Sequence, residues 1–122
     1  MKVDAYVADS NVLIDLLKGD ARIKKLLRGV PIHVSFMTEV EVLAWPKATK
    51  EDLVLIRALL VQCIIVDPSP AIKEATITLR SSSKLRIADC FVAATAQVLE
   101  LPLLTRDQAF KKVAKELKVE LL

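Results

Sequence analysis

Four acidic side chains in this sequence occur where a carboxylate could take part in chemistry. Asp9 directly follows the short apolar run at residues 5–8, and Glu41 lies near the start of a helical pattern after a second run. Asp89 is near the start of an alanine-rich helical pattern, and Asp107 follows the run LPLL. Ligands bind at the carboxyl ends of the strands in open α/β sheets. If the apolar runs are parallel strands, the four carboxylates would meet at one sheet edge.

Each of these acids taken alone has a simpler interpretation. Asp9, Asp89 and Asp107 could be helix caps, each worth roughly 1 kcal/mol, and Glu41 could complete a capping box with Thr38. Taken together, four carboxylates in a partly dry cleft repel one another and raise one another's pKa values. A divalent cation relieves this repulsion. Because no useful Cys or His is nearby, the oxygen ligands point to Mg²⁺ or Mn²⁺ over zinc.

The chemistry expected of such a site is the cutting of a phosphodiester. Acid clusters of this kind hold one or two metal ions that orient a water molecule and stabilise the charge that develops at phosphorus. A negative site binds a negative nucleic-acid backbone only through such metals and surrounding basic residues. The candidate contacts to such a backbone that are nearest in the sequence are Arg80, Lys84, Arg86 and Arg106.

Strand and helix patterns alternate along the chain, which is typical of a parallel sheet covered by helices on both faces. Strands are expected at residues 5–8, 31–35, 64–66, 101–105 and 119–122. Helices are expected at residues 11–17, 21–28, 38–45, 51–62, 70–79, 87–99 and 108–117. The polar tract at residues 81–83 has the composition of a flexible connection. The expected fold class is therefore α/β, with residues 1–122 forming one domain.

Composition narrows the class of protein further. The chain has 122 residues, enough for a single core. Its apolar share is 53% but its aromatic share only 4%, and the helix expected at residues 51–62 is apolar nearly all round. This surplus of aliphatic surface predicts that the chain self-associates. Eighteen basic residues against fifteen acidic ones permit, without demanding, the binding of a polyanion.

Cysteine usage and hydropathy predict a cytoplasmic location. Cys63 and Cys90 belong to no disulfide framework or zinc-ligand spacing, so both are expected to be buried, reduced thiols. The sequence has no signal-peptide pattern and no apolar stretch long enough for a membrane span.

Four sequence blocks carry a resemblance to a known family: ADSNVLIDLL, SFMTEVEVLA, LRIADCFVAATA and LPLLTRDQAF. In this order and at these separations they resemble the four blocks of a PIN domain, and they are most similar to those of VapC-type toxin ribonucleases. The resemblance covers essentially the whole chain, and its first and third blocks are the specific ones. It implies a PIN-like three-layer α/β/α sandwich, endonucleolytic cleavage of RNA, a homodimer, and inhibition by a cognate VapB-like antitoxin of a type II toxin–antitoxin pair.

The resemblance also implies roles for individual residues. It makes the binding of Mg²⁺ or Mn²⁺ the task of Asp9, Glu41, Asp89 and Asp107. It further implies that Asn11 supports the pocket, that Ser10 contacts water on the metal, and that Thr105 is the hydroxyl residue beside the fourth acid. Glu39 is the competing acid of the second block. The spacing from Ser35 favours Glu41, and a helix places the two glutamates on different faces.

Two other classes of protein stay open at this point. One is a catalytically inactive PIN-like module that only binds RNA or protein, against which the presence of all four acids argues. The other is a phospho-acceptor receiver domain, which has a similar length and a doubly wound sheet. A receiver would need an acidic pair after the first strand and a late lysine, but Ser10 and Asn11 follow Asp9, and LPLLTRD offers Arg106 and Asp107.

Asp15 is expected to face solvent or to form a salt bridge.

Overall fold

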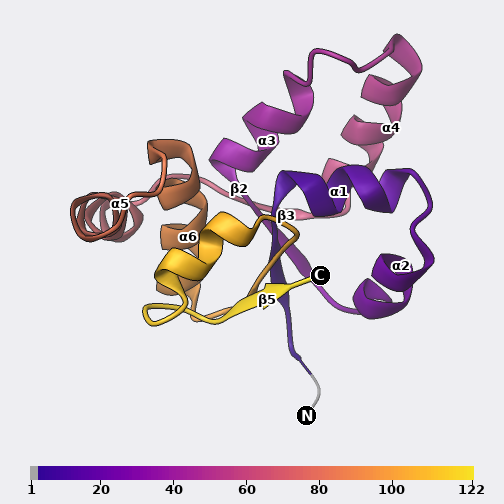
Figure 1. Ribbon diagram of the computed structural model, residues 1–122. Helices are drawn as coiled ribbons and strands as arrows, with labels where there is room; N and C mark the ends of the chain where they lie inside the picture. Colours follow the sequence, from indigo (N-terminus) through magenta and orange to yellow (C-terminus); the bar gives the residue numbers. More distant parts are fainter. Residues whose placement is uncertain (1–2) are drawn as a thin grey trace.

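A five-stranded, all-parallel sheet forms the centre of the computed structural model, which describes residues 3–122 (Figure 1). The strand order is β3-β2-β1-β4-β5. The strands are β1 (Tyr6–Ala8), β2 (Ile32–Ser35), β3 (Ile64–Val66), β4 (Leu103–Thr105) and β5 (Val119–Leu121). In the register of the sheet, Val7 of β1 lies beside His33 of β2 and Leu103 of β4. The expectation of an α/β fold with about five parallel strands is confirmed.

Helices cover both faces of this sheet (Figure 1). One face carries α1 (Ser10–Leu17), α2 (Ala21–Leu27), α3 (Phe36–Leu43) and α4 (Lys50–Val61). The other carries α5 (Pro70–Ser82), α6 (Ile87–Leu99) and the 3₁₀ helix η1 (Gln108–Val113). No helix within residues 3–122 is long and apolar enough to cross a bilayer.

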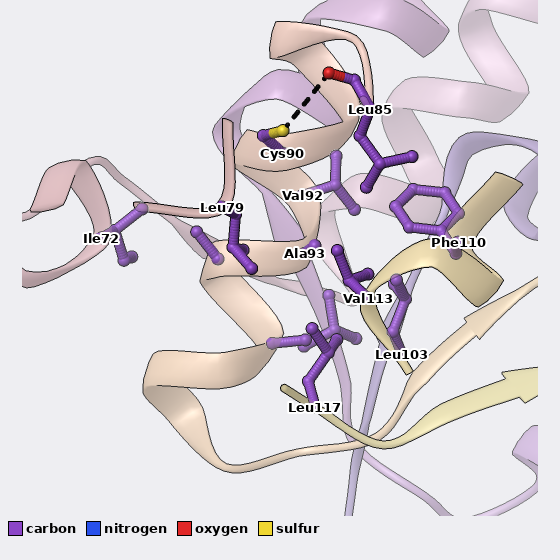
Figure 2. Packing of buried hydrophobic residues seen from close by; sticks show 13 residues of the cluster. Ile72, Leu79, Leu85, Cys90, Val92, Ala93, Leu103, Phe110, Val113 and Leu117 are labelled. Carbon is purple, nitrogen blue, oxygen red and sulfur yellow. Dashed lines mark hydrogen bonds between the residues drawn. The ribbon is translucent and has the colours of Figure 1, made fainter. Parts of the chain in front are cut away.

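The central strand β1 separates two hydrophobic cores, because successive side chains of a strand point to opposite faces. Tyr6 and Ala8 pack in the core under α1 to α4. Val7 packs in the core under α5, α6 and η1, part of which Figure 2 shows. Cys90 belongs to this second core, and its Sγ donates to the carbonyl of Leu85 at 3.6 Å. A short run buried on both faces is therefore followed immediately by the acid at position 9.

The direction of winding reverses at β1. The chain passes from β1 to β2 and β3 on one side, and later adds β4 and β5 on the other side. Because the segments after β1 and after β4 leave on opposite faces, a crevice opens at the carboxyl ends of these two neighbouring strands. Asp9 follows β1 and Thr105 ends β4, so the topology brings both to this crevice.

Helix α3 begins two residues earlier than the sequence pattern predicts. The expected start was Thr38, but the helix begins at Phe36 because the hydroxyl of Ser35 accepts a hydrogen bond from the amide of Met37 at 3.1 Å. Thr38 is buried inside the helix and caps nothing. The alternative interpretation of Glu41, as the partner of Thr38 in a capping box, is therefore wrong.

Helix α5 ends later than expected and the helix after β4 ends earlier. The hydroxyls of Ser82 and Ser83 donate to carbonyls one turn back, at 3.0 and 2.6 Å, which extends α5 to Ser82. The expectation of a flexible connection at residues 81–83 is therefore wrong. After β4 the chain forms only the short 3₁₀ helix η1, in which residues three apart lie on one side. Phe110 and Val113 have this spacing, and both are buried.

Local capping residues account for other helix boundaries. The capping box of α4 is present, since Thr49 Oγ1 accepts from the amide of Asp52 at 3.0 Å and the Asp52 carboxylate accepts from the amide of Thr49 at 2.9 Å. Ser69 caps α5 ahead of Pro70. Gly29 follows α2 with a φ of +69°, a left-handed conformation that favours glycine.

Candidate active site

The carboxylate of Asp9 is the centre of a hydrogen-bond network at the carboxyl end of β1. Its Oδ1 accepts from the amide of Ser10 at 2.8 Å, which makes Asp9 the N-cap of α1 as well. Its Oδ2 accepts from Thr105 Oγ1 at 2.7 Å and from Asn11 Nδ2 at 3.1 Å. Because these donors come from β4 and from the first turn of α1, the buried carboxylate is held from two sides.

Asn11 and Thr105 extend the network to the segment after β4. Asn11 Oδ1 accepts from the amide of Arg106 at 3.1 Å, and Thr105 Oγ1 accepts from the amide of Asp107 at 3.0 Å. The carboxylate of Asp107 in turn accepts from the amide of Ala109 at 2.9 Å and caps η1. Thr105 therefore links the first acid of the set to the fourth.

Asp89 lies in the first turn of α6 and does not cap it. The N-cap of α6 is Arg86, which makes no side-chain cap hydrogen bond, so the capping interpretation of Asp89 is wrong. The buried Asp89 carboxylate instead accepts from Arg86 Nε at 3.3 Å. The Arg86 side chain is 78% exposed, so this ion pair adds little to stability.

The four acids influence one another electrostatically. Burial raises the pKa of Asp9, the charges of Asp89 and Asp107 raise it further, and the hydrogen bonds from Thr105 and Ser10 oppose the rise. Burial likewise raises the pKa of Glu41, as do the charges of Asp9 and Asp89. Arg86, whose own pKa is raised by Asp89, Asp107 and Glu41, partly offsets the effect on Glu41. The acids of β1, α3, α6 and the segment after β4 thus share one electrostatic field.

The donor set fits a hard divalent cation in kind. Carboxylate and hydroxyl oxygens are the ligands that Mg²⁺ and Mn²⁺ prefer, and a cation would relieve the raised pKa values of Asp9 and Glu41. In the part of the chain that the structure describes, no three Asp, Glu, His or Cys side chains are close enough to form a ready-made metal site. The carboxylates would therefore have to draw closer to one another to hold an ion.

The basic residues expected to contact a nucleic-acid backbone differ in whether acidic side chains already neutralise their charges. Arg106 contacts two carboxylates: its Nε lies 2.6 Å from Asp15 Oδ2, and its Nη2 donates to Asp20 Oδ2 at 2.8 Å. These ion pairs hold its guanidinium toward the connection between α1 and α2. Asp15 is thus the salt-bridge partner that the sequence suggested. Arg80 in the last turn of α5 and Lys84 just before α6 are both exposed.

The ion pair between Arg106 and Asp20 was not predicted from the sequence. The two residues are 86 positions apart, and Asp20 is also the N-cap of α2, where its Oδ1 accepts from the amide of Ile23 at 3.0 Å. No local sequence signal predicts this contact, because it depends on how α1 and α2 pack against the end of β4.

The geometry defines an α/β protein with an acidic site at the point where the winding of its parallel sheet reverses. Residues 6–116 match the family model of the PIN domain. This chain belongs to the PIN domain family. PIN domains are generally nucleases. A comparison with curated proteins gave no match.

Solved structures with the same fold include several complexes. A toxin–antitoxin complex from Klebsiella pneumoniae contains a chain 32% identical to this one, with 95% of each chain covered and a TM-score of 0.78. VapBC2 from Rickettsia felis, bound to a DNA fragment from its promoter, is 18% identical over 97% of this chain and 98% of that one, with a TM-score of 0.83. DNA-bound VapBC from Salmonella typhimurium is 15% identical, covering 95% and 96%, with a TM-score of 0.81. The last two show likeness of fold alone.

Proposed function

We propose that this chain is a Mg²⁺- or Mn²⁺-dependent endoribonuclease, the toxin of a VapBC-type toxin–antitoxin pair. The observation that carries the proposal is that four acids from separate elements, Asp9, Glu41, Asp89 and Asp107, lie within electrostatic reach of one another. Asp9 is held by Thr105 and Asn11, and burial together with the neighbouring acids raises its pKa and that of Glu41. Membership of a family whose members are generally nucleases supports the same conclusion.

The residues of the chain have distinct tasks in this proposal. Asp9, Glu41, Asp89 and Asp107 hold the metal, which when bound supplies Lewis-acid stabilisation of the phosphate and activates the attacking water. Thr105 and Asn11 fix the orientation of Asp9 through hydrogen bonds of 2.7 and 3.1 Å. Because hydrogen bonds from outside the ligand shell orient the ligands, these two residues also matter for metal affinity.

The substrate in this proposal is RNA, held beside the acids by exposed cations. Arg80 and Lys84 are exposed, and Arg86 stands at the edge of the acid cluster against Asp89. Arg106 contributes differently, because Asp15 and Asp20 already neutralise its charge. The main electrostatic attraction for the phosphate backbone is therefore assigned to Arg80, Lys84 and Arg86.

The partners in this proposal are a VapB-like antitoxin and a second copy of the chain. The relative from Klebsiella pneumoniae, at 32% identity, comes from a toxin–antitoxin complex. Self-association is supported by α4, which buries Ile56 and Leu60 but leaves Val54, Leu55 and Val61 exposed by 69%, 53% and 85%. An apolar outer face of this kind is typical of an interface.

The test is an RNA-cleavage assay in Mg²⁺ and in Mn²⁺ with the single variants Asp9→Asn and Asp89→Asn. Cleavage is expected to fall by at least about 100-fold in each, since changes outside the ligand shell alone cost 10–100-fold. The matched control is Asp4→Asn, an exposed acid before β1 that lies away from the carboxyl ends of the strands. Undiminished cleavage by both site variants would contradict the proposal. Wild-type RNA binding without any cleavage would instead indicate a binding module.

A further inference from the structure

Thr38 is exceptional among the buried threonines of residues 3–122. Three of the four have a partner for the hydroxyl: Thr76 donates to the carbonyl of Ile72 at 2.7 Å, Thr95 to that of Phe91 at 3.0 Å, and Thr105 to Asp9 at 2.7 Å. The hydroxyl of Thr38 is fully buried, and within the described chain no group accepts its proton or donates to it. A buried hydroxyl left in this state destabilises a protein by an amount comparable to a lost hydrogen bond, and so needs a physical reason.

The position of Thr38 in α3 explains why its hydroxyl lacks the hydrogen bond that a helical threonine usually makes. A helical threonine normally donates to the carbonyl four residues back, as Thr76 and Thr95 do. For Thr38 that residue is Val34, which belongs to strand β2 and not to the helix. Since α3 follows β2 with no intervening residue, the carbonyl is not presented along the helix axis. Valine at position 38 would avoid the problem with almost the same shape.

The neighbours of Thr38 place it beneath the acidic site. Glu41 is three residues further along α3, so the two side chains are adjacent on the helix surface, with Cβ atoms about 5–6 Å apart. The carboxyl of Glu41 lies within the electrostatic reach of Asp9 and Asp89. Val42, four residues after Thr38, is buried in the core under α1 to α4. Thr38 therefore stands between the core-facing and the site-facing sides of α3.

We propose that Thr38 is a positioning residue, whose buried hydroxyl donates to the carboxylate of Glu41 when the four acids draw together around a divalent cation. The inference rests on the proposed function and names a residue that supports that same site. It gives a role to a buried hydroxyl that has no partner among the described residues. Outer-shell donors of this kind change metal affinity by about 10–100-fold when removed.

The inference predicts opposite effects of Thr38→Val on stability and on metal affinity. In the metal-free protein, valine removes an unsatisfied hydroxyl, so the melting temperature is expected to stay the same or to rise. Affinity for Mn²⁺, measured by calorimetric titration, is expected to fall by about 10-fold or more. Thr38→Ser, which keeps the hydroxyl, is expected to restore wild-type affinity. Thr38→Ala serves as a second apolar variant should valine fail to fold.

Thr76→Val is the matched control, because Thr76 is a buried helical threonine on α5 whose hydroxyl is already satisfied. It is expected to lower the melting temperature and to leave Mn²⁺ affinity unchanged. An affinity for Mn²⁺ within about twofold of wild type in the apolar variants of Thr38 would overturn the inference, whatever their stability. Wild-type protein that binds no Mn²⁺ would instead overturn the proposed function, so the two failures are distinguishable.

Discussion

At the scale of single residues, Asp9 has a structural role as a helix cap and, in the proposed function, a chemical role as a metal ligand. One carboxylate oxygen caps α1 through the amide of Ser10, and the other collects the donors of Thr105 and Asn11. The sequence could predict that these residues meet, because each lies where a strand ends in a parallel sheet. It could not predict the pairing of Arg106 with Asp15 and Asp20, which depends on the tertiary placement of α1 and α2.

The raised pKa values of Asp9 and Glu41 predict a dependence of stability on pH. The folded, metal-free protein binds these protons more tightly than the unfolded chain, whose ordinary pKa values are 3.8 and 4.5. The two groups therefore favour folding most at low pH, and this contribution is lost as the pH rises above 3.8 and 4.5 through their raised pKa values.

The contribution of Asp9 can be isolated by comparing wild type with Asp9→Asn. Thermal unfolding in a chelator is measured over a range of pH upward from the ordinary pKa of 3.8, because the contribution of Asp9 is lost above that value. Relative to wild type, the variant is expected to gain stability as the pH rises, because it has no carboxylate to ionise. Two melting curves that stay parallel across this range would show that Asp9 carries no such penalty.

Thr105→Val should damage both stability and activity. The substitution removes the donor to Asp9 Oδ2 and the acceptor for the amide of Asp107. Leaving buried groups unpaired lowers the free energy of unfolding by about 1–3 kcal/mol, and RNA cleavage should fall by about 10–100-fold. Denaturant unfolding and a cleavage assay measure the two effects. Thr105→Ser, which retains the hydroxyl, should behave as wild type; a silent valine variant would refute the role given to this bond.

At the scale of elements, alternation of strand and helix was enough to predict the order of the fold, whereas helix ends were less predictable. The capping box of Thr49 and Asp52 is a local signal of the kind that a sequence does reveal. The start of α3 was missed because Ser35 is at once the last residue of β2 and the cap of the helix, which leaves no loop to mark the change. The extra turn of α5 depends on serine hydroxyls bonding back to the helix, which composition does not reveal.

The outer face of α4 predicts self-association. The sequence suggested that this helix is covered on more than one side, but within residues 3–122 Val54 and Val61 remain 69% and 85% exposed. Changing both to glutamate should shift a dimer toward monomer, because two charges cannot be buried unpaired. Light scattering at micromolar concentration measures the change.

A suitable control for the α4 variant is Lys73→Glu on α5, which changes the net charge by the same amount on the opposite face of the sheet. It should leave the association state unchanged. Wild-type protein that is monomeric throughout would rule out the proposed interface.

At the scale of the whole molecule, a modest net charge of +3 conceals an uneven distribution. Exposed cations lie at the end of α5 and the start of α6, and one of them, Arg86, contacts the buried carboxylate of Asp89. A substrate with a phosphate backbone would therefore meet attraction and repulsion side by side. The proposed cation relieves the repulsion, and Arg80 and Lys84 supply attraction that depends on salt.

The double variant Arg80→Ala with Lys84→Ala should weaken RNA binding. For a single strand, each lost phosphate contact reduces the slope of log affinity against log salt by about 0.7, so the slope should fall by about 1.4. Lys115→Ala with Lys118→Ala is the control, because these exposed lysines precede β5 on the side away from the strand ends. An equal loss of affinity in both double variants would mean that the attraction is spread over the whole surface.

The central claim is that acids from four separate segments form one metal site, and calorimetric titration with Mn²⁺ tests it most directly. Wild-type protein should bind Mn²⁺, and each of Asp9→Asn, Glu41→Gln, Asp89→Asn and Asp107→Asn should weaken binding by about 10-fold or more. Asp4→Asn should bind as wild type does. Wild-type affinity retained by the Asp9 and Asp89 variants would contradict the claim.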